Sequence, residues 1–342
     1  MIGKMFCAAA VAAALGCAVS QARTFTVLQW NIWQEGTVVP GGAEAIADEI
    51  ARLKPDFVTL SEVRNYGDRD YTATLVEQLG ERGERYYSFR TYDSGLLSRY
   101  PITDTMTVFP ERDDHGSIYR LTTEADGHRF AIYTAHLDYR DCAYYDVRGY
   151  DGSTWKPVEP ARSVADVIRR NDASQRHVAI RQFIKQAAAD TDSGRIVILG
   201  GDFNEPSHLD WTERTAAMFD HGGLVVPWTV TTLLDRAGFI DTYRKLYPDA
   251  VTHPGFTYPS AIPGFPPEKI TWAPKADERE RIDYIFLSPH SGLTIDSAQI
   301  FGPRGSVVRS VVRDEIGLDR FIEPLKVWPT DHKGLLVTFS VD

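Results

Sequence analysis

Short apolar runs bounded by polar turns alternate with helical periodicity along the chain. Residues 24–31 and 56–62 are predicted strands, because aromatic and β-branched residues are frequent in both. Between them, apolar residues recur at i, i+4 and i+7 from Ile46 to Leu53, which predicts a helix ended by Pro55. Further strands are predicted over residues 130–136, 195–199, 282–287 and 335–341, with a helix over residues 174–189.

This succession predicts a mixed α/β protein in which sheets pack on one another and helices lie outside them. Propensity alone leaves a doubly wound sheet as the alternative. No linker, repeat or low-complexity tract interrupts residues 23–342, so we expect this range to form a single domain. A hydrophobic content of 43% is enough for a sizeable core.

Residues 1–22 have the layout of a secretory signal peptide. Lys4 precedes an apolar run over residues 5–19, and small residues follow where a signal peptidase would cleave. The run is shorter than the roughly 20 residues needed to cross a bilayer, which disfavours a membrane anchor. We therefore expect export to the periplasm or the medium, with no transmembrane segment in the mature chain. A lipoprotein processing box ending at Cys17 is the minority alternative.

Cysteine content and net charge bear on disulfide bonding and on the class of partner. Only Cys142 lies beyond the predicted signal peptide, so the expected mature chain forms no intrachain disulfide. A net charge of −10, without a Lys/Arg-rich stretch, counts against binding of nucleic acid by phosphate neutralisation. A nucleic-acid partner is therefore not favoured, and we expect a monomer.

Polar side chains that can carry chemistry recur near the ends of the predicted strands, where open α/β proteins usually build their sites. Carboxylate and amide oxygens suit a hard cation such as Mg²⁺, Mn²⁺ or Ca²⁺, and imidazoles suit proton transfer or stabilisation of an oxyanion. An acid inside an apolar strand, such as Asp283, needs a partner, for which His332 is a candidate. The full set is Asn31, Glu62, His136, Asp138, Asp202, Asn204, Asp283, Asp331 and His332.

These residues stand in an ordered series of short motifs. The series is Trp30-Asn31-Ile32, Ser61-Glu62-Val63, Gly95 to Pro101, His136-Leu137-Asp138, Gly201-Asp202-Phe203-Asn204, Arg281-Ile282-Asp283-Tyr284 and Thr330-Asp331-His332. In this order the chain resembles the endonuclease/exonuclease/phosphatase superfamily from Trp30 to His332, with Gly-Asp-Phe-Asn and Asp-His as the most specific pieces. The resemblance implies a four-layer α/β sandwich, with two mixed β-sheets face to face and helices outside.

The resemblance also implies a metal site. Glu62 would be the main ligand of a divalent cation, with Asn31 beside it and Asp331 contributing. Some nucleases of the superfamily carry an Asp two residues after the first-strand Asn, where this chain has Trp33. The resemblance therefore favours one metal ion over two.

Catalytic roles follow from the same resemblance. Asp202 would orient or deprotonate the attacking water, and Asn204 would hold that water and the phosphate. His332, its ring fixed by Asp283, would bind a phosphoryl oxygen, and His136 would face the phosphate as a donor or acid. Phosphoryl transfer depends on positioning and charge neutralisation, which this set can supply.

The stretch between His136 and the predicted helix at Ser174 looks like an insertion rich in Tyr, Trp and Arg. Functional groups concentrate on long loops, which favours a substrate-recognition loop. The alternative is a loop that packs its own aromatic side chains onto the body. The candidate substrate-binding residues are Asp138, Tyr145, Arg148 and Trp155, together with Arg64, for which an ion-pairing role is the favoured alternative.

The sequence as a whole predicts an exported, divalent-metal-dependent phosphoester hydrolase. We expect a phosphodiesterase or phosphatase that acts on a small molecule, a glycan or a lipid headgroup. No exposed apolar hairpin suited to lipid insertion is evident. An exported DNase or RNase is the first alternative. A non-catalytic module that binds phosphate or glycan is the second, although such a module would not need the complete set of polar residues.

Overall fold

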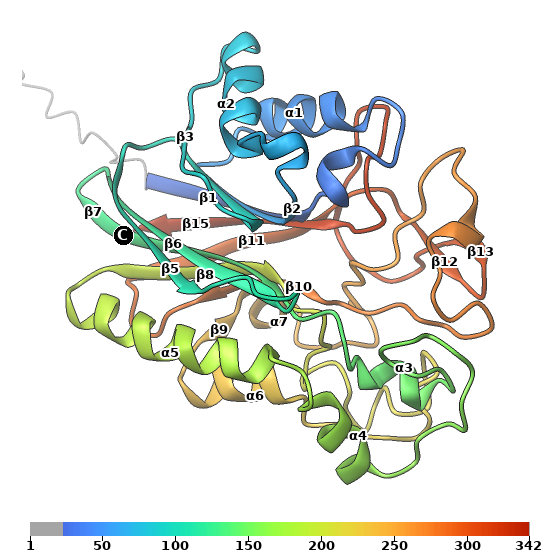
Figure 1. Cartoon of the computed structure of the whole chain (residues 1–342). Helices are drawn as coiled ribbons and strands as arrows, with labels where there is room; N and C mark the ends of the chain where they lie inside the picture. The colour runs from blue at the N-terminus through green and yellow to red at the C-terminus, as the bar shows by residue number, and fades with distance from the viewer. Residues whose placement is uncertain (1–22, 342) are drawn as a thin grey trace, which may run out of the picture.

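A computed structural model describes residues 23–341 and shows two mixed β-sheets packed face to face, with helices against their outer faces (Figure 1). The four-layer α/β sandwich expected from the resemblance is therefore confirmed. The predicted signal peptide, including Cys17, lies outside the described residues. Within residues 23–341, no helix combines the length and hydrophobicity needed to span a membrane.

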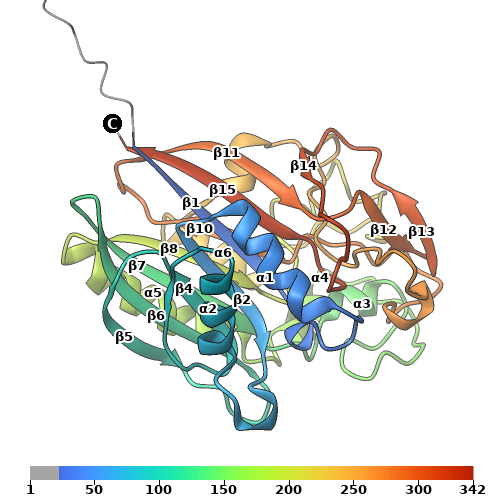
Figure 2. The same ribbon diagram turned by 90° about the horizontal axis from the view of Figure 1, so that it is seen from above.

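The first sheet has seven strands in the order β14-β11-β15-β1-β2-β4-β3. Its central strand β1 pairs in parallel with β2 and antiparallel with β15. Helices α1 and α2 lie over its outer face, as Figure 2 shows from above. The bounds are β1 Arg23–Asn31, β2 Phe57–Val63, β3 Tyr87–Ser88, β4 Asp93–Ser98, β11 Leu293–Phe301, β14 Phe321–Ile322, β15 Gly334–Val341, α1 Gly42–Leu53 and α2 Tyr71–Glu81.

The second sheet has six strands in the order β5-β6-β7-β8-β10-β9. Its pair β7–β8 is parallel, and β10 runs antiparallel to β8. Helices α5 and α6 cover its outer face (Figure 1). The bounds are β5 Ile102–Phe109, β6 Gly116–Ala125, β7 His128–Leu137, β8 Ile196–Asp202, β9 Ile240–Asp241, β10 Asp283–Leu287, α5 Arg176–Asp192, α6 Thr229–Arg236 and α7 Thr242–Leu246.

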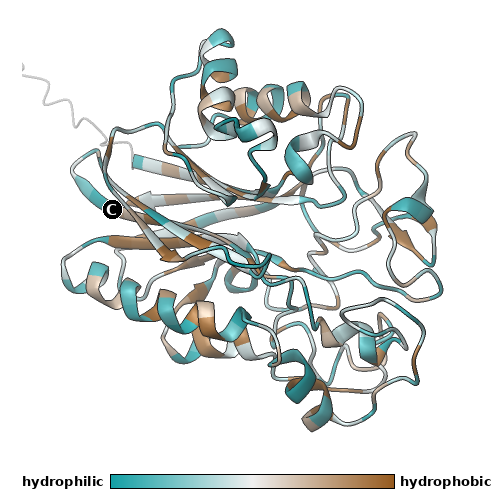
Figure 3. Cartoon of the chain, viewed as in Figure 1, coloured by the Kyte–Doolittle hydropathy of each residue, from teal (hydrophilic) through white to brown (hydrophobic). Residues whose placement is uncertain are grey.

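Alternation of side chains along the strands separates the core into layers. Phe25 and Val27 of β1 pack with Phe130 of β7 between the two sheets, whereas Leu28 and Trp30 of β1 face the helices on the outside. All five side chains are fully buried. The helices carry both hydrophobic and hydrophilic residues (Figure 3), which fits helices with one face on a sheet and the other in solvent.

Two glycines near the end of β8 permit a close approach of neighbouring backbone and side chains. A Cβ atom on Gly200 would lie 2.2 Å from Thr59 Oγ1 of the opposite sheet, and one on Gly201 would lie 2.4 Å from the carbonyl oxygen of Ala135. A side chain at either position would push its neighbours away. Glycine therefore sets the spacing of the strands just before Asp202.

A side lobe beside the strand ends has an apolar cluster of its own. We define the side lobe as residues 139–172, 205–228 and 270–280. Its cluster includes Tyr144, Tyr145, Trp211 and Trp228, all nearly or fully buried. The lobe contains two short helices, α3 (Ala143–Val147) and α4 (Val164–Asn171), which lie near one another in Figure 1.

A separate two-stranded hairpin, β12 (Gly305–Val308) and β13 (Val311–Asp314), stands apart from the two sheets. Val311 and Val312 are each 46% exposed. The hairpin was not predicted from the sequence, because its strands are too short to be recognised from their pattern. Its turn is Arg309-Ser310 and β13 ends in Arg313-Asp314, so its exposed surface is mixed in polarity. The remaining helical turns are η1 Gln34–Gly36, η2 Tyr66–Asp68 and η3 Pro267–Lys269.

Candidate active site

The chain topology brings the polar strand ends to one edge of the sandwich. The parallel pairs β1–β2 and β7–β8 each place two carboxyl ends side by side. Strands β10 and β15 run antiparallel to β8 and β1, so their amino ends reach the same edge. The register places His136 and Asp283 opposite Asp202, one on each side.

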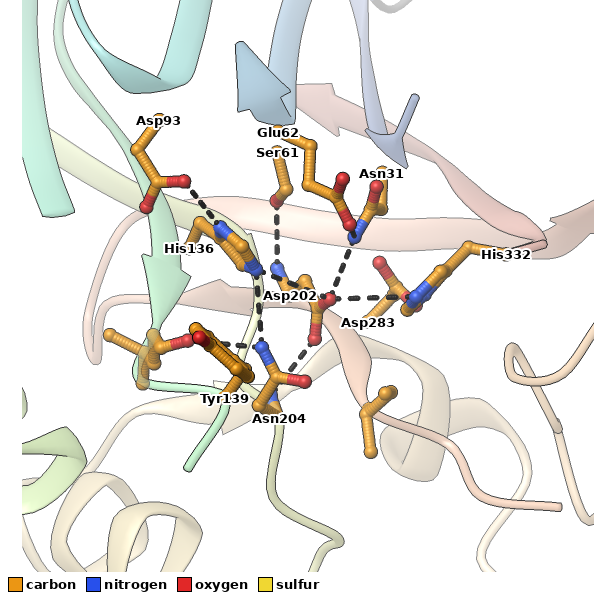
Figure 4. A network of polar contacts seen from close by, with 12 residues as sticks. Asn31, Ser61, Glu62, Asp93, His136, Tyr139, Asp202, Asn204, Asp283 and His332 are labelled. Carbon is orange, nitrogen blue, oxygen red and sulfur yellow. Dashed lines mark hydrogen bonds and ion pairs between the residues drawn. The ribbon is translucent and has the colours of Figure 1, made fainter. Parts of the chain in front are cut away.

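Asp202 lies at the centre of the resulting polar network (Figure 4). Its Oδ2 accepts a hydrogen bond from Asn31 Nδ2 at 2.9 Å, and its Oδ1 accepts one from the backbone N–H of Asn204 at 2.9 Å. Oδ2 also lies 3.9 Å from His136 Nε2 and 3.7 Å from His332 Nε2. Burial raises the pKa of Asp202 and the neighbouring His332 lowers it, with a result of about 6.

Each imidazole of the network is held through its Nδ1 by a carboxylate. His332 Nδ1 lies 2.9 Å from Asp283 Oδ2, and His136 Nδ1 lies 2.9 Å from Asp93 Oδ1. Burial lowers the pKa of both rings, but the paired carboxylates raise it to about 10 for His332 and about 9 for His136. Both rings are therefore cations near neutral pH, which suits them to donate hydrogen bonds to an anion.

The structure places Asp283 against His332 as expected, but Asp93 is a site residue that the sequence reasoning missed. Asp93 begins β4 with a left-handed backbone (φ 68°) and is 1% exposed. Its position just before the motif from Gly95 to Pro101 is the signal that could have identified it.

A β-bulge sets the direction of Glu62. The register between β2 and β4 shifts between Ser61 and Val63, and Glu62 has φ 67°. Such bulges occur beside active sites, where they re-aim a side chain. Glu62 Oε1 accepts a hydrogen bond from Asn31 Nδ2 at 3.2 Å, and Oε2 accepts one from the backbone N–H of Gln34 at 3.0 Å.

Asp331 supplies a second carboxylate near Glu62 in the same cavity. It is 6% exposed, and its Oδ1 has no hydrogen-bond partner among the described residues. Burial raises the pKa of Asp331 to about 7, with His332 lowering it and Glu62 raising it. An unpaired buried carboxylate oxygen is costly, and a bound cation would remove that cost.

A second group of side chains has metal-ligand spacing. Ligand atoms of Asp202, Asp283 and His332 all lie within 4.8 Å of one another. However, His332 Nδ1 and Asp283 Oδ2 already bond to each other at 2.9 Å. Glu62 and Asp331 therefore fit a divalent cation better than that group does, because a cation between them would contact the unpartnered Oδ1 of Asp331.

The network borders a cavity of about 410 Å³. Of the predicted catalytic and metal-binding residues, Asn31 and Asp283 lie behind the cavity wall and contact residues that line it. Those that line the cavity are Glu62, His136, Asp202, Asn204, Asp331 and His332.

The predicted substrate-binding residues divide into two groups. Tyr145, Trp155 and Arg64 line the cavity. Arg64 Nη1 is also held at 2.9 Å from Asp93 and 3.1 Å from Asp114, which is the ion-pairing role that was favoured.

Asp138 and Arg148 do not line the cavity. Asp138 is 1% exposed and bonds to His115 Nδ1 at 2.8 Å and to the backbone N–H of Gln175 at 2.9 Å. Arg148 donates to Glu280 Oε1 at 2.7 Å and to backbone oxygens of the side lobe. The structure thus gives both side chains protein partners, and we leave them out of the proposed substrate site. Spacing along the chain could not reveal this, because these partners lie far apart in the sequence and meet only in the fold.

Comparison with known proteins identifies the family to which this architecture is related. Residues 28–332 match the model of the Endonuclease/Exonuclease/phosphatase family. The uncharacterized protein F14F9.5 of Caenorhabditis elegans is 28% identical over 262 residues, which cover 76% of this chain and 77% of that protein.

Two solved structures share the fold at low sequence identity. TDP2 of D. rerio, complexed with a single-strand DNA product, has a TM-score of 0.53 and 18% identity, with 92% of this chain and 98% of that chain covered. The catalytic domain of human Nocturnin, with a bound sulfate anion, has a TM-score of 0.51 and 17% identity, with 93% and 95% covered. Since the family match extends over most of the sequence, this chain belongs to the endonuclease/exonuclease/phosphatase family.

Proposed function

We propose that this protein is a divalent-metal-dependent phosphoester hydrolase in which water attacks phosphorus in line. The observation that carries the proposal is one cavity that combines Asp202, two imidazoles held by carboxylates, and the unpartnered carboxylate oxygen of Asp331. A general base, hydrogen-bond donors for phosphoryl oxygens and a cation site are the parts that phosphoryl transfer needs. Family membership supports the same reaction class.

Glu62 and Asp331 would hold the cation, with Asn31 positioning Glu62 through its Nδ2 hydrogen bond. When bound, Mg²⁺, Mn²⁺ or Ca²⁺ would neutralise charge on the phosphoryl oxygens. Trp33 stands two residues after Asn31 and offers no ligand, so we propose a single ion.

The chain's own residues would carry the remaining steps. Asp202, fixed through both carboxylate oxygens by Asn31 and Asn204, would orient the water and accept its proton. His136 and His332 would each donate a hydrogen bond from Nε2 to a phosphoryl or leaving oxygen. Pre-positioned donors cost no reorganisation during reaction, which is why their carboxylate partners matter.

We propose a small phosphodiester or phosphomonoester as the substrate, in the class of small molecules, glycans and lipid headgroups. Arg64 is the only Lys or Arg on the cavity wall among the described residues, and two carboxylates already pair with it. A long nucleic-acid strand would require several phosphate contacts. TDP2, one of the similar structures, was solved with a single-strand DNA product, so a nuclease remains the second candidate.

We also propose that the protein is exported as a monomeric single domain after loss of residues 1–22. The signal-like N-terminal pattern supports export, and the family match over residues 28–332 supports a single domain. N-terminal sequencing of the protein recovered outside the cytoplasm should begin at Arg23, and retention of Met1 in that material would contradict it. Sedimentation analysis should give the mass of one chain.

Hydrolysis of bis-p-nitrophenyl phosphate and of p-nitrophenyl phosphate tests the proposed reaction. We expect release of nitrophenolate with Mg²⁺, Mn²⁺ or Ca²⁺ and none in EDTA. Preference for the diester would identify a phosphodiesterase, and preference for the monoester a phosphatase. Full activity in EDTA would contradict the metal dependence.

Substitutions test the assigned roles in the same assay. Asp202→Ala and His332→Ala should each lower turnover by about 10²–10⁴-fold without unfolding the protein. The exposed Asp192 and His290 supply matched controls, and their alanine variants should keep normal turnover. Normal activity of either purified site variant would remove the role given to that residue.

A further inference from the structure

Three aromatic rings form a stack on one wall of the active-site cavity. The rings of Tyr139 and Trp155 are parallel within 2°, with centroids 6.3 Å apart. The rings of Trp155 and Trp272 have centroids 4.6 Å apart at an angle of 31°. All three side chains line the same cavity as Asp202 and Asn204. The stack therefore borders the space in which the phosphoester would react.

The stack has an open end at Trp272, whose side chain is 48% exposed. Aromatic rings prefer to stack on other rings, and an exposed indole at a cavity is a common ligand contact. Trp155, in contrast, is only partly exposed and packs against the apolar cluster of the side lobe. At the other end, Tyr139 is also only partly exposed, and the Arg140 guanidinium lies over its ring at 5.4 Å. Trp272 is thus the member of the stack that can accept one more ring.

A buried carboxylate holds Trp272 in place although its side chain is exposed. Glu278 is fully buried, and its Oε2 accepts hydrogen bonds from the backbone N–H groups of Trp272 and Ala273, each at 3.1 Å. The same oxygen accepts a hydrogen bond from Tyr145 Oη at 3.1 Å. Such anchoring fixes the backbone at Trp272, and the contact with Trp155 orients the ring, which together reduce the entropy lost on binding.

The charge of the cavity limits what the stack can bind. Sites for single-stranded nucleic acid combine stacked aromatic side chains with a positive groove that follows the backbone. Here, among the described residues, Arg64 is the one Lys or Arg side chain on the cavity wall, and it pairs with Asp93 and Asp114. A volume of about 410 Å³ is of the size that binds small molecules. The cavity therefore suits one planar ring attached to one phosphoester.

We propose that the substrate is a nucleotide-sized phosphoester whose planar aromatic ring stacks on Trp272, at the end of the Tyr139–Trp155–Trp272 stack. The phosphorus would then lie within the same cavity near Asp202. This inference rests on the proposed hydrolase function, because it places the ring relative to the phosphoester of that reaction. It makes Trp272 a residue that determines substrate specificity.

Calorimetric titration tests the ring subsite without turnover. The protein carries Asp202→Asn, and the probes are adenosine 5′-monophosphate, ribose 5-phosphate and glucose 6-phosphate in Mg²⁺ buffer. We expect adenosine 5′-monophosphate to bind about ten-fold more tightly than ribose 5-phosphate, as one stacked base would provide. Adding Trp272→Ala should abolish this difference, and Trp272→Phe should keep most of it. Trp33→Ala, which removes another indole of the cavity wall, should leave the difference in place.

Several results would overturn the ring subsite. These are equal affinities for adenosine 5′-monophosphate and ribose 5-phosphate, a difference that survives Trp272→Ala, no binding of adenosine 5′-monophosphate, or equally tight binding of glucose 6-phosphate. Nitrophenyl ester hydrolysis by the wild-type protein separates this failure from failure of the proposed function. Hydrolysis of the nitrophenyl esters without preferential binding of adenosine 5′-monophosphate would overturn only the ring subsite. Preferential binding of adenosine 5′-monophosphate without ester hydrolysis would contradict only the proposed hydrolase function.

Discussion

Asp93 sets the charge of His136 although it does not line the cavity. Burial lowers the pKa of His136, while the facing carboxylates of Asp93, Asp202 and Glu62 raise it to about 9. Asp93 makes the direct hydrogen bond and also pairs with Arg64 at 2.9 Å. A ring that is a cation up to about pH 9 can donate to a phosphoryl oxygen over the whole neutral range.

The Asp93→Asn variant should therefore change the pH dependence of kcat/KM. The protonated ring is the active form, so activity through His136 is present below its pKa and is lost as pH rises through about 9. Loss of the Asp93 charge lowers that pKa, so the alkaline decline should move to lower pH. Asp104→Asn, which changes an exposed carboxylate that pairs with the buried Arg120, is the control and should leave the profile in place. An unchanged profile in Asp93→Asn would contradict the positioning role.

Single residues show where the sequence was informative. Asp283 could be paired with His332 because a carboxylate within an apolar strand needs a partner. Asp93 was missed because it begins a strand, where an Asp is usually a turn residue. Arg148 was assigned to the substrate because its type suits phosphate, and only the fold reveals that Glu280 and backbone oxygens use its donors. Residue types therefore indicated the chemistry of the site, whereas the contact partners of each side chain could be identified only from the three-dimensional structure.

At the scale of elements, the strands with the strongest apolar pattern could be located from the sequence within one to three residues. The predicted strand over residues 24–31 is β1, Arg23–Asn31, and the predicted helix over residues 174–189 is α5, Arg176–Asp192. The bulge at Glu62 had no signal, because it depends on the register with β4. The short strands β12 and β13 were also missed, since four residues give too little periodicity.

Gly200 is the position where the approach of the two sheets can be tested. Gly200→Ala would place a Cβ 2.2 Å from Thr59 Oγ1, so we expect a loss of about 1–3 kcal/mol in the free energy of unfolding. Gly80→Ala is the matched control, because nothing lies within 4 Å of its Cβ and it stands in α2. That change should stabilise the protein by roughly 0.5–1 kcal/mol. Chemical denaturation measures both, and equal effects would contradict the close approach.

The side lobe depends on a buried ion pair between Arg148 and Glu280, both nearly or fully buried. Arg148→Ala leaves the Glu280 carboxylate without its charged partner, so we expect destabilisation by about 3–5 kcal/mol. Arg169→Ala removes an exposed pair with Asp166 in the same lobe and should change stability by less than about 0.5 kcal/mol. If Arg148→Ala instead raised KM with unchanged stability, Arg148 would belong to the substrate site after all.

For the whole molecule, a bound cation should raise stability, because it binds the folded carboxylates and not the unfolded chain. At a free-ion concentration about 100 times Kd, the expected gain is about 2.7 kcal/mol. Glu62→Gln should abolish the rise in Tm with added Mn²⁺, and Glu77→Gln, on the exposed face of α2, should preserve it. A rise that persists in Glu62→Gln would place the cation elsewhere.

The separate apolar cluster of the side lobe has a consequence for how this protein can diversify. The proposed hydrolytic residues stand on strand ends fixed by the inter-sheet core, whereas Trp155 and Trp272 belong to the lobe with its own cluster. A replacement lobe would have to keep Asp210, which pairs with Arg244 and Arg281 of the sandwich, and Glu205, which pairs with Arg176 of α5. A chimera with a foreign lobe should retain basal nitrophenyl ester hydrolysis but acquire a new substrate range, which makes the lobe a natural module for directed evolution.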